Sequence, residues 1–233
     1  STGKLGQGVV PVDLEPLAAP AVYGKDRLFV YLRKTGQHDA ALAELRASGQ
    51  PALTFEMPDP YDLAAEFYRW EVATAVACAA LKVNAFDQPD VQDAKDRTKA
   101  KIVEYQQHGK LTESVFASLD KAPAALAEFL QQAKPGDYLA INAYLPRNPE
   151  MESALTALRF ALRARTGCAT TVGFGPRFLH STGQLHKGGA DNGMFIQIIT
   201  DHPQDADIPT QNMPFSALER AQALGDYEAL AAR

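Results

Sequence analysis

The sequence predicts an α/β fold: a doubly wound, mostly parallel, five-stranded sheet with helices on both faces, in a flavodoxin-like three-layer sandwich. Short runs rich in β-branched and aromatic residues alternate along the chain with longer segments of helical periodicity, which is the pattern of βαβ units. Residues 138–145 and 194–200 are apolar almost throughout, as expected of strands that are covered on both faces. Clusters of Gly and Pro separate these runs from the helices. We expect one domain over residues 1–233, with an entry segment at 1–24 and a C-terminal tail and helix at 201–233.

The elements are predicted in chain order from periodicity and end signals. Residues 9–12 form a short edge strand, because Pro11 is tolerated only at an edge. The main strands are predicted at 27–33, 52–56, 138–145, 168–174 and 194–200. Helices are predicted at 40–47, from Asp59 or Asp62 to 81, from 88 to 107, at 122–133 and 151–165, and after Phe215, with a turn at 114–121. The buried side of the second helix is expected to hold Phe67, Trp70, Val72, Ala75 and Ala79.

Composition excludes several classes of function. The formal net charge is -5 and no Lys/Arg cluster is present, which argues against nucleic-acid binding. Cys78 and Cys168 both lie in apolar runs, so we expect buried free thiols in a reducing compartment. No stretch is apolar enough to span a bilayer, and no signal peptide is visible, so a cytoplasmic location without membrane contact is expected. No spacing typical of metal ligands occurs, and neither a metal nor a cofactor is implied.

Residues 173–189 concentrate the polar side chains that could carry chemistry. They follow a predicted strand, and in an open α/β sheet ligands bind beyond the carboxyl ends of the strands. If residues 179–187 are helical, His180, Gln184 and Lys187 fall at i, i+4 and i+7 and share one face. The alternative is an ordinary connection in which the histidines only cap or hydrogen-bond.

Residues 84–95 form a second candidate segment. Asp87 is a suitable N-cap, and Pro89 fits the first helical turn, where its missing N–H costs nothing. Lys95 lies one to two turns into this helix, close enough for its amine to reach a ligand near the capped end. The alternative is a capped amphipathic helix with a surface lysine.

Three stretches resemble segments of phosphoglucose isomerases. LHSTGQLHKGG is similar to the segment that carries the ring-opening histidine, which gives His180 that role and matches Gln184 to a glutamine of the same helix. FDQPDVQDAK is similar to F-D-Q-x-G-V-E-x-x-K, whose lysine contacts the sugar ring oxygen, and Lys95 takes that place. STGK is similar to E-S-x-G-K, where the glutamate is the general base, so Gly3 and Lys4 would lie at the substrate and the chain would begin one residue after the base.

Two features depart from the family pattern. Asp90 stands where the family usually has Gly, and Gln92 stands where it has Glu, which puts the local turn geometry in doubt more than the role of Lys95. The order of the segments also differs, because in most phosphoglucose isomerases the histidine segment precedes the lysine segment. The order of the segments and the residues of the LHSTGQLHKGG stretch favour a resemblance to the isomerase half of transaldolase/phosphoglucose isomerase fusion proteins.

The resemblance implies the second sugar-isomerase (SIS) subdomain of an enzyme that interconverts glucose 6-phosphate and fructose 6-phosphate without a cofactor. It implies an upstream SIS subdomain of the same chain, which would hold the phosphate, and a homodimer in which His180 serves its own or the neighbouring subunit. Residues 1–233 alone are therefore expected to be inactive. The alternative is a non-catalytic SIS module that binds sugar phosphates and regulates a partner. Convergence of His180 and Lys95 on one crevice would favour the enzyme.

Overall fold

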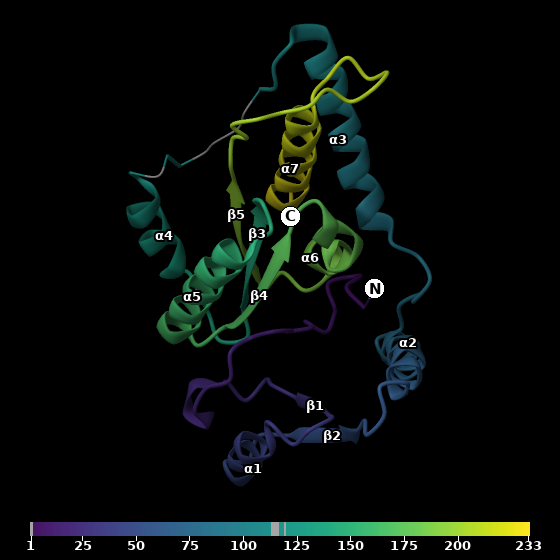
Figure 1. Cartoon of the computed structure of the whole chain (residues 1–233), viewed down its shortest axis with the longest axis vertical. Coiled ribbons are helices and arrows are strands. Elements are labelled where there is room, and N and C mark those ends of the chain that lie inside the picture. The colour runs from purple at the N-terminus through teal and green to yellow at the C-terminus, as the bar shows by residue number, and fades with distance from the viewer. Residues whose placement is uncertain (1, 113–116, 119) are drawn as a thin grey trace.

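The computed structural model describes residues 2–112, 117, 118 and 120–233 of the chain (Figure 1). Its elements are η1 (Pro20–Val22), β1 (Phe29–Arg33), α1 (Asp39–Ala47), β2 (Ala52–Glu56), α2 (Asp62–Ala80), α3 (Pro89–His108), α4 (Ala122–Leu130), β3 (Tyr138–Tyr144), α5 (Pro149–Thr166), β4 (Ala169–Phe174), η2 (Arg177–His180), α6 (Gly183–Gly188), β5 (Gly193–Ile199) and α7 (Phe215–Ala231). The turn predicted at 114–121 lies largely outside the described residues. Within the described part of the chain, no helix is both long and apolar enough to cross a membrane.

The five main strands form as predicted, and every pair among them is parallel. They do not form one sheet, however: among the described residues β1 and β2 pair only with each other, and β4-β3-β5 form a separate three-stranded sheet. The prediction of one continuous five-stranded sheet is therefore wrong, although the α/β class is confirmed. Residues 9–12 are not a strand, and Pro11 in that segment lacks the N–H that a ladder needs.

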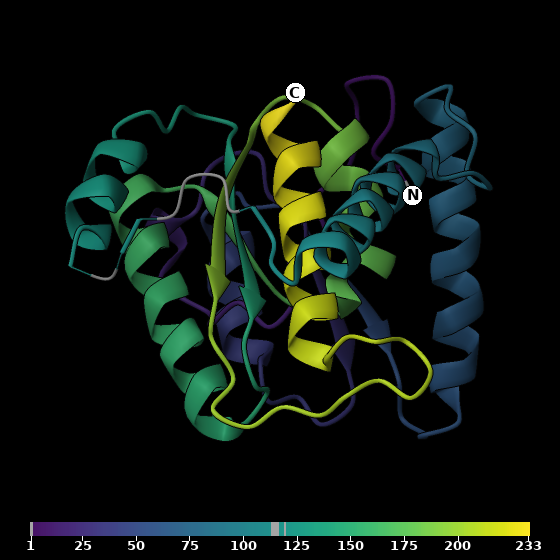
Figure 2. The same ribbon diagram turned by 90° about the horizontal axis from the view of Figure 1, so that it is seen from above.

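The three-stranded sheet lies between two layers of helices (Figures 1 and 2). Every residue of β3 is buried, as its unbroken apolar pattern predicted. On one face, Leu126 of α4 and Leu155 and Leu162 of α5 pack against Leu139 and Ile141 of β3. The other face carries α3, α6 and α7, of which α3 and α7 pack against each other along their length. The predicted helices on both faces are thus confirmed for this sheet.

Helix α2 differs from the prediction in its surroundings. Phe67 is 63% exposed, Trp70 44% and Val72 43%, so the face expected to be buried is open to solvent, while Glu66 and Cys78 are buried instead. Ala79 is also exposed, and Ala75 is half-buried. The helix lies at the edge of the molecule and does not cover the three-stranded sheet (Figure 2). Its apolar residues surround the helix rather than marking one stripe, so the sequence pattern did not define a buried side.

The entry segment is fixed to the main sheet through Glu15. Its carboxylate accepts hydrogen bonds from the Thr170 hydroxyl at 2.6 Å and the Thr170 N–H at 3.2 Å, and it forms an ion pair with Arg163 at 3.3 Å. Arg163 also donates to the carbonyl of Pro16. The first part of the chain therefore crosses beneath β4 before it reaches β1 (Figure 1).

The helix-end signals act as predicted at two positions. Gly109 ends α3 and Gly167 ends α5, both in the left-handed conformation with φ of 68° and 70°. Asn148 caps α5 by accepting from the Met151 N–H at 2.9 Å. Both cysteines are buried free thiols, as predicted.

Candidate functional site

The N-terminal segment enters the site as a tight turn. Lys4 and Gln7 exchange two backbone hydrogen bonds of 2.9 and 3.0 Å, and between them Leu5 and Gly6 adopt φ of 53° and 72°. Two successive positive φ values define the turn type that prefers Gly at its second position. The turn is held against the end of α6, where the Gly6 N–H donates to the Gly188 carbonyl at 3.2 Å.

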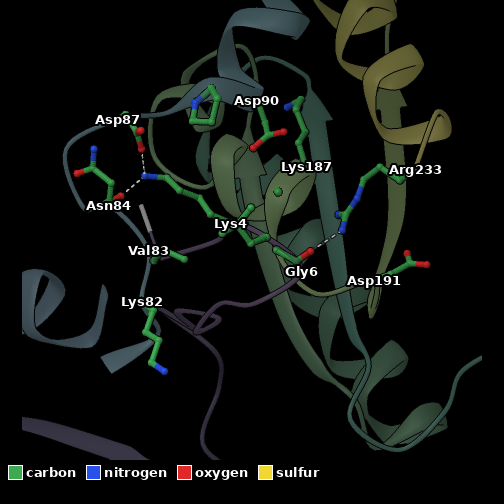
Figure 3. Close-up of a pocket in the computed structure, with 14 residues that line it drawn as sticks. Lys4, Gly6, Lys82, Val83, Asn84, Asp87, Asp90, Lys187, Asp191 and Arg233 are labelled. Atoms are coloured by element: carbon green, nitrogen blue, oxygen red, sulfur yellow. Dashed lines mark hydrogen bonds and ion pairs between the residues drawn. The ribbon is translucent and has the colours of Figure 1, made fainter. Parts of the chain in front are cut away.

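Lys4 extends from this turn to the segment that precedes α3. Its ammonium forms an ion pair with Asp87 and also donates to the carbonyl of Asn84 (Figure 3). Asp87 therefore does not cap α3 as predicted; the N-cap is Gln88, whose side chain makes no capping bond. Pro89 occupies the first turn of α3, as predicted. The Lys4 side chain is only 7% exposed, so this contact fixes the approach of the chain to α3.

Gln184, on α6, joins all three segments singled out in the sequence. Its Nε2 donates to the Gly3 carbonyl at 2.8 Å and to the carboxylate of Asp90, and its Oε1 accepts from the Asp90 N–H at 3.0 Å. The residue is 1% exposed. Segments that lie 94 and 181 residues from Gln184 in the chain thus meet at one buried carboxamide. Because Gln184 is fully engaged by the protein, its side chain is not free to bind a substrate in this arrangement.

A cavity of about 710 Å³ adjoins this junction (Figure 3). Its charged lining residues are Lys4, Lys82, Asp87, Asp90, Lys187, Asp191 and Arg233. Several of these are already paired: Lys4 with Asp87, and Arg233 with the carbonyls of Gly189 and Ala190 at 2.7 and 3.3 Å. The cavity lies at the C-terminal end of α6 and the amino end of β5, not at the carboxyl strand edge that the sequence predicted.

His180 and Lys95, the two predicted catalytic residues, both lie on the surface. His180 is the last residue of η2, and Lys95 is in the second turn of α3; η2 and α3 both pack against α6. Within the described part of the chain, neither side chain forms a hydrogen bond or an ion pair, so the imidazole and the ammonium are open to a ligand. Neither residue lines the cavity. Their convergence on one substrate stays a prediction.

The expected common face of His180, Gln184 and Lys187 does not form. The chain is not one helix from 179 to 187: η2 ends at His180, and α6 begins only at Gly183. As a result Gln184 and Lys187 are buried while His180 is exposed.

A buried polar layer lies beneath the site, and the sequence analysis did not identify it. His186 Nδ1 is 2.9 Å from the Tyr138 hydroxyl, and Lys187 forms an ion pair with Asp226 of α7. Burial, assisted by the positive charges of Lys187 and Arg233, lowers the pKa of His186 to about 3. Burial likewise raises the pKa of Asp226, although Lys187 opposes this effect. His186 is therefore neutral at physiological pH and acts as a structural partner of Tyr138.

Two further polar residues, Arg147 and His202, are engaged by neighbouring side chains. Arg147 pairs with Glu152 at 2.6 Å and lies over the Phe174 ring. His202 is partly buried beside Glu219 at 2.6 Å. Among the described residues, no three His, Cys, Asp or Glu side chains are grouped as metal ligands would be.

Comparison with known proteins adds no name to this site. No family model matches the chain, and no curated protein or solved structure is significantly similar to it.

Proposed function

We propose that this chain is the C-terminal part of an aldose–ketose isomerase that interconverts glucose 6-phosphate and fructose 6-phosphate, fused in the longer protein to a transaldolase. One observation carries the proposal: the three segments that resemble phosphoglucose isomerase motifs, remote in sequence, meet at Gln184. A chance resemblance of short stretches gives no reason for them to meet. The SIS-type fold, the upstream subdomain and the homodimer belong to the same proposal.

In this reaction the sugar ring must open before the carbonyl moves. A proton leaves the C1 hydroxyl, the bond between C1 and the ring oxygen breaks, and the ring oxygen takes up a proton. His180 is assigned the first transfer, because a histidine exchanges protons near neutral pH. Lys95 is assigned to the ring oxygen as a cationic donor. Both side chains are exposed and unpaired within the described residues, which leaves them available for these roles.

The second stage moves a proton between C2 and C1 through an enediol, and it needs a carboxylate base. His180 and Lys95 are already assigned to ring opening, so this proposal gives the role to a further residue. The resemblance places a glutamate directly before Ser1, next to the segment that Gln184 holds through Gly3. In this proposal Gly3 positions the segment through its carbonyl, which accepts from Gln184, and Lys4 does so through its ion pair with Asp87.

The test is an isomerase assay on the longer chain that carries this glutamate. We expect turnover of fructose 6-phosphate by the longer chain and none by residues 1–233. His180→Ala should slow the cyclic sugar far more than the open-chain form, and Lys95→Met should do the same. His38→Ala, at another exposed histidine, is the matched control. Equal losses on both substrate forms would contradict the ring-opening role.

A second candidate is a non-catalytic module that binds sugar phosphates and regulates a partner. The cavity favours it, because its lining holds Lys82, Lys187 and Arg233 but neither His180 nor Lys95. Binding of a sugar phosphate to residues 1–233, weakened by Lys82→Met and unchanged by His180→Ala, together with absence of turnover by the longer chain, would select this candidate.

A further inference from the structure

Both ends of the Gln184 carboxamide are held by groups of the protein. All of its contacts are to the protein: the Gly3 carbonyl at 2.8 Å, the Asp90 N–H at 3.0 Å and the Asp90 carboxylate. Each of these groups lies on a different segment from Gln184 itself. The residue is 1% exposed, so water cannot replace these hydrogen bonds if one is lost.

Asp90 is the matching half of this arrangement. It lies in the first turn of α3, where the backbone N–H groups have no partner within the helix. Its own N–H is satisfied by Gln184 Oε1, and its carboxylate accepts from Gln184 Nε2. The contact is therefore two-way and fixes both the distance and the rotation of α3 relative to α6.

Gly188 shows how closely the groups approach. A Cβ built on it would lie 2.6 Å from Gln184 Nε2 and 2.6 Å from the Gly3 carbonyl oxygen, and it would overlap the Asp90 carboxylate. Only a residue without a side chain leaves room for these three groups to meet.

We propose that Gln184 and Asp90 form a positioning clamp that sets the N-terminal segment and the start of α3 relative to α6. The inference rests on the proposed function, because under it these segments carry the base, Lys95 and His180. Gln184 is then a positioning residue and not, as the sequence analysis expected, a substrate ligand. A displacement of about 1 Å between reacting groups can lower turnover about 100-fold.

The clamp can be tested without any substrate, in residues 1–233. We expect the Asp90 amide to exchange with solvent about 10-fold faster or more in Gln184→Leu, since the amide loses its acceptor and the clamp loses the two hydrogen bonds of Gln184 Nε2 as well. Asp90→Asn keeps the backbone N–H and an acceptor oxygen and should retain slow exchange. An Asp90 amide that exchanges equally fast in Gln184→Leu and in the unsubstituted chain would overturn the clamp.

The effect on the reaction is tested in the longer chain. Gln184→Leu should lower kcat about 100-fold with little change in KM. Asp90→Leu, which removes the carboxylate acceptor of Gln184 Nε2, should lower kcat in the same direction, and Asp90→Asn, which keeps an acceptor oxygen, should retain it. The matched control is Gln50→Leu, because Gln50 also ties a loop, through the Gly24 carbonyl at 3.2 Å, but lies in the β1–β2 unit. That variant should lose stability and keep kcat.

The outcomes separate the two proposals. A raised KM with unchanged kcat in Gln184→Leu would mean that Gln184 binds substrate, and it would overturn the positioning role. If Gln50→Leu lowered kcat to the same extent, the effect of Gln184→Leu on kcat would reflect general destabilisation. This outcome would also overturn the positioning role. Absence of isomerase activity in the unsubstituted longer chain would overturn the proposed function, while the exchange of the Asp90 amide still decides whether the clamp exists.

Discussion

Lys187 and Asp226 form an ion pair in surroundings that exclude water almost completely, with side-chain exposures of 4% and 0%. A charge in such a place is costly unless its partner remains. The pair joins α6 to α7, so it supports the helix that carries Gln184. The sequence predicted Lys187 on one helix face with His180 and Gln184. It could not identify Asp226 as the partner, because Asp226 is one of several charged residues in α7.

Removal of one member of this pair should be strongly destabilising. We expect Asp226→Leu to lower the free energy of unfolding by about 3–5 kcal/mol, because it leaves Lys187 buried without a counter-charge. The control is Lys99→Met, which breaks an exposed pair with Asp96 and should cost less than about 1 kcal/mol. Urea unfolding measures both variants. A loss below 1 kcal/mol in Asp226→Leu would show that the pair is hydrated or open.

The lowered pKa of His186 predicts how stability depends on pH. An unfolded histidine takes up a proton as the pH falls through about 6.5, whereas folded His186 resists until about pH 3. In this window the unfolded state binds the extra proton, so the contribution of His186 to stability is complete above pH 6.5 and declines as the pH falls. The decline is at most about 1.4 kcal/mol per pH unit.

The measurement compares the unsubstituted chain with His186→Gln by urea unfolding at several values between pH 7 and pH 4. The stability advantage of the unsubstituted chain should shrink steadily as the pH is lowered. Tyr138→Phe removes the hydrogen bond and keeps the imidazole, so it should retain the pH dependence. A difference between the unsubstituted chain and His186→Gln that is constant with pH would contradict the assignment.

At the scale of the elements, α3 and α7 form the closest helix contact on their side of the sheet. They approach at Gly225, where an added Cβ would lie 2.6 Å from Thr98 Oγ1 and 2.8 Å from the Thr98 backbone nitrogen. Both helices were predicted from their periodicity. Their contact was not, because Gly225 appears in the sequence only as a weak residue within a helical pattern.

Gly225→Ala should therefore destabilise the protein, although alanine favours a helix by about 1 kcal/mol over glycine. Overpacking against backbone atoms typically costs about 1–3 kcal/mol, so we expect a lower melting temperature. Gly183→Ala is the matched control, since a Cβ there would make only ordinary contacts of 3.7 Å or more. A rise in the melting temperature of Gly225→Ala would show that the helices lie further apart.

The strands and helices follow from local signals, and the sequence predicted nearly all of them. The split between the two sheets could not be predicted in this way, because strand pairing depends on residues far apart in the chain. In the structure, β1 alternates between half-buried and exposed residues and β2 is also partly exposed, whereas every residue of β3 is buried, so the two sheets differ in how far they are covered.

At the scale of the molecule, the β1–β2 unit and α2 expose many apolar side chains. Phe67 is 63% exposed and Val76 62%, while Leu53 of β2 is 47% exposed. Substitution of such residues removes little buried surface. The contrast is Leu45 of α1, which is 2% exposed and belongs to the small core of this unit.

We therefore expect Phe67→Ser and Val76→Ser to change the free energy of unfolding by no more than about 0.5 kcal/mol. Leu45→Ala should lower it by about 2–5 kcal/mol. Urea unfolding of the three variants tests this directly. A loss of several kcal/mol in Phe67→Ser would mean that α2 packs against the rest of the protein in solution.

Also at the scale of the molecule, only part of the site could be predicted from the sequence. The resemblance to a family selected Gly3 and Gln184 as residues of one site, and the structure brings them into contact. Asp90, which departs from the family pattern, also contacts Gln184, and the sequence did not predict this contact. The sequence could not predict where His180 lies relative to Lys95. Both side chains are exposed and lie on different elements, so no pattern of buried residues relates one to the other.

Gly3 lies directly against Leu185, so closely that a Cβ on it would overlap the Leu185 Cα, an atom of the main chain that cannot turn aside. Two residues further on, Leu5 is 81% exposed and touches little. In a library randomised over this short stretch and sorted for correctly folded molecules, the third position would keep a single amino acid, whereas the fifth would tolerate a broad range of replacements.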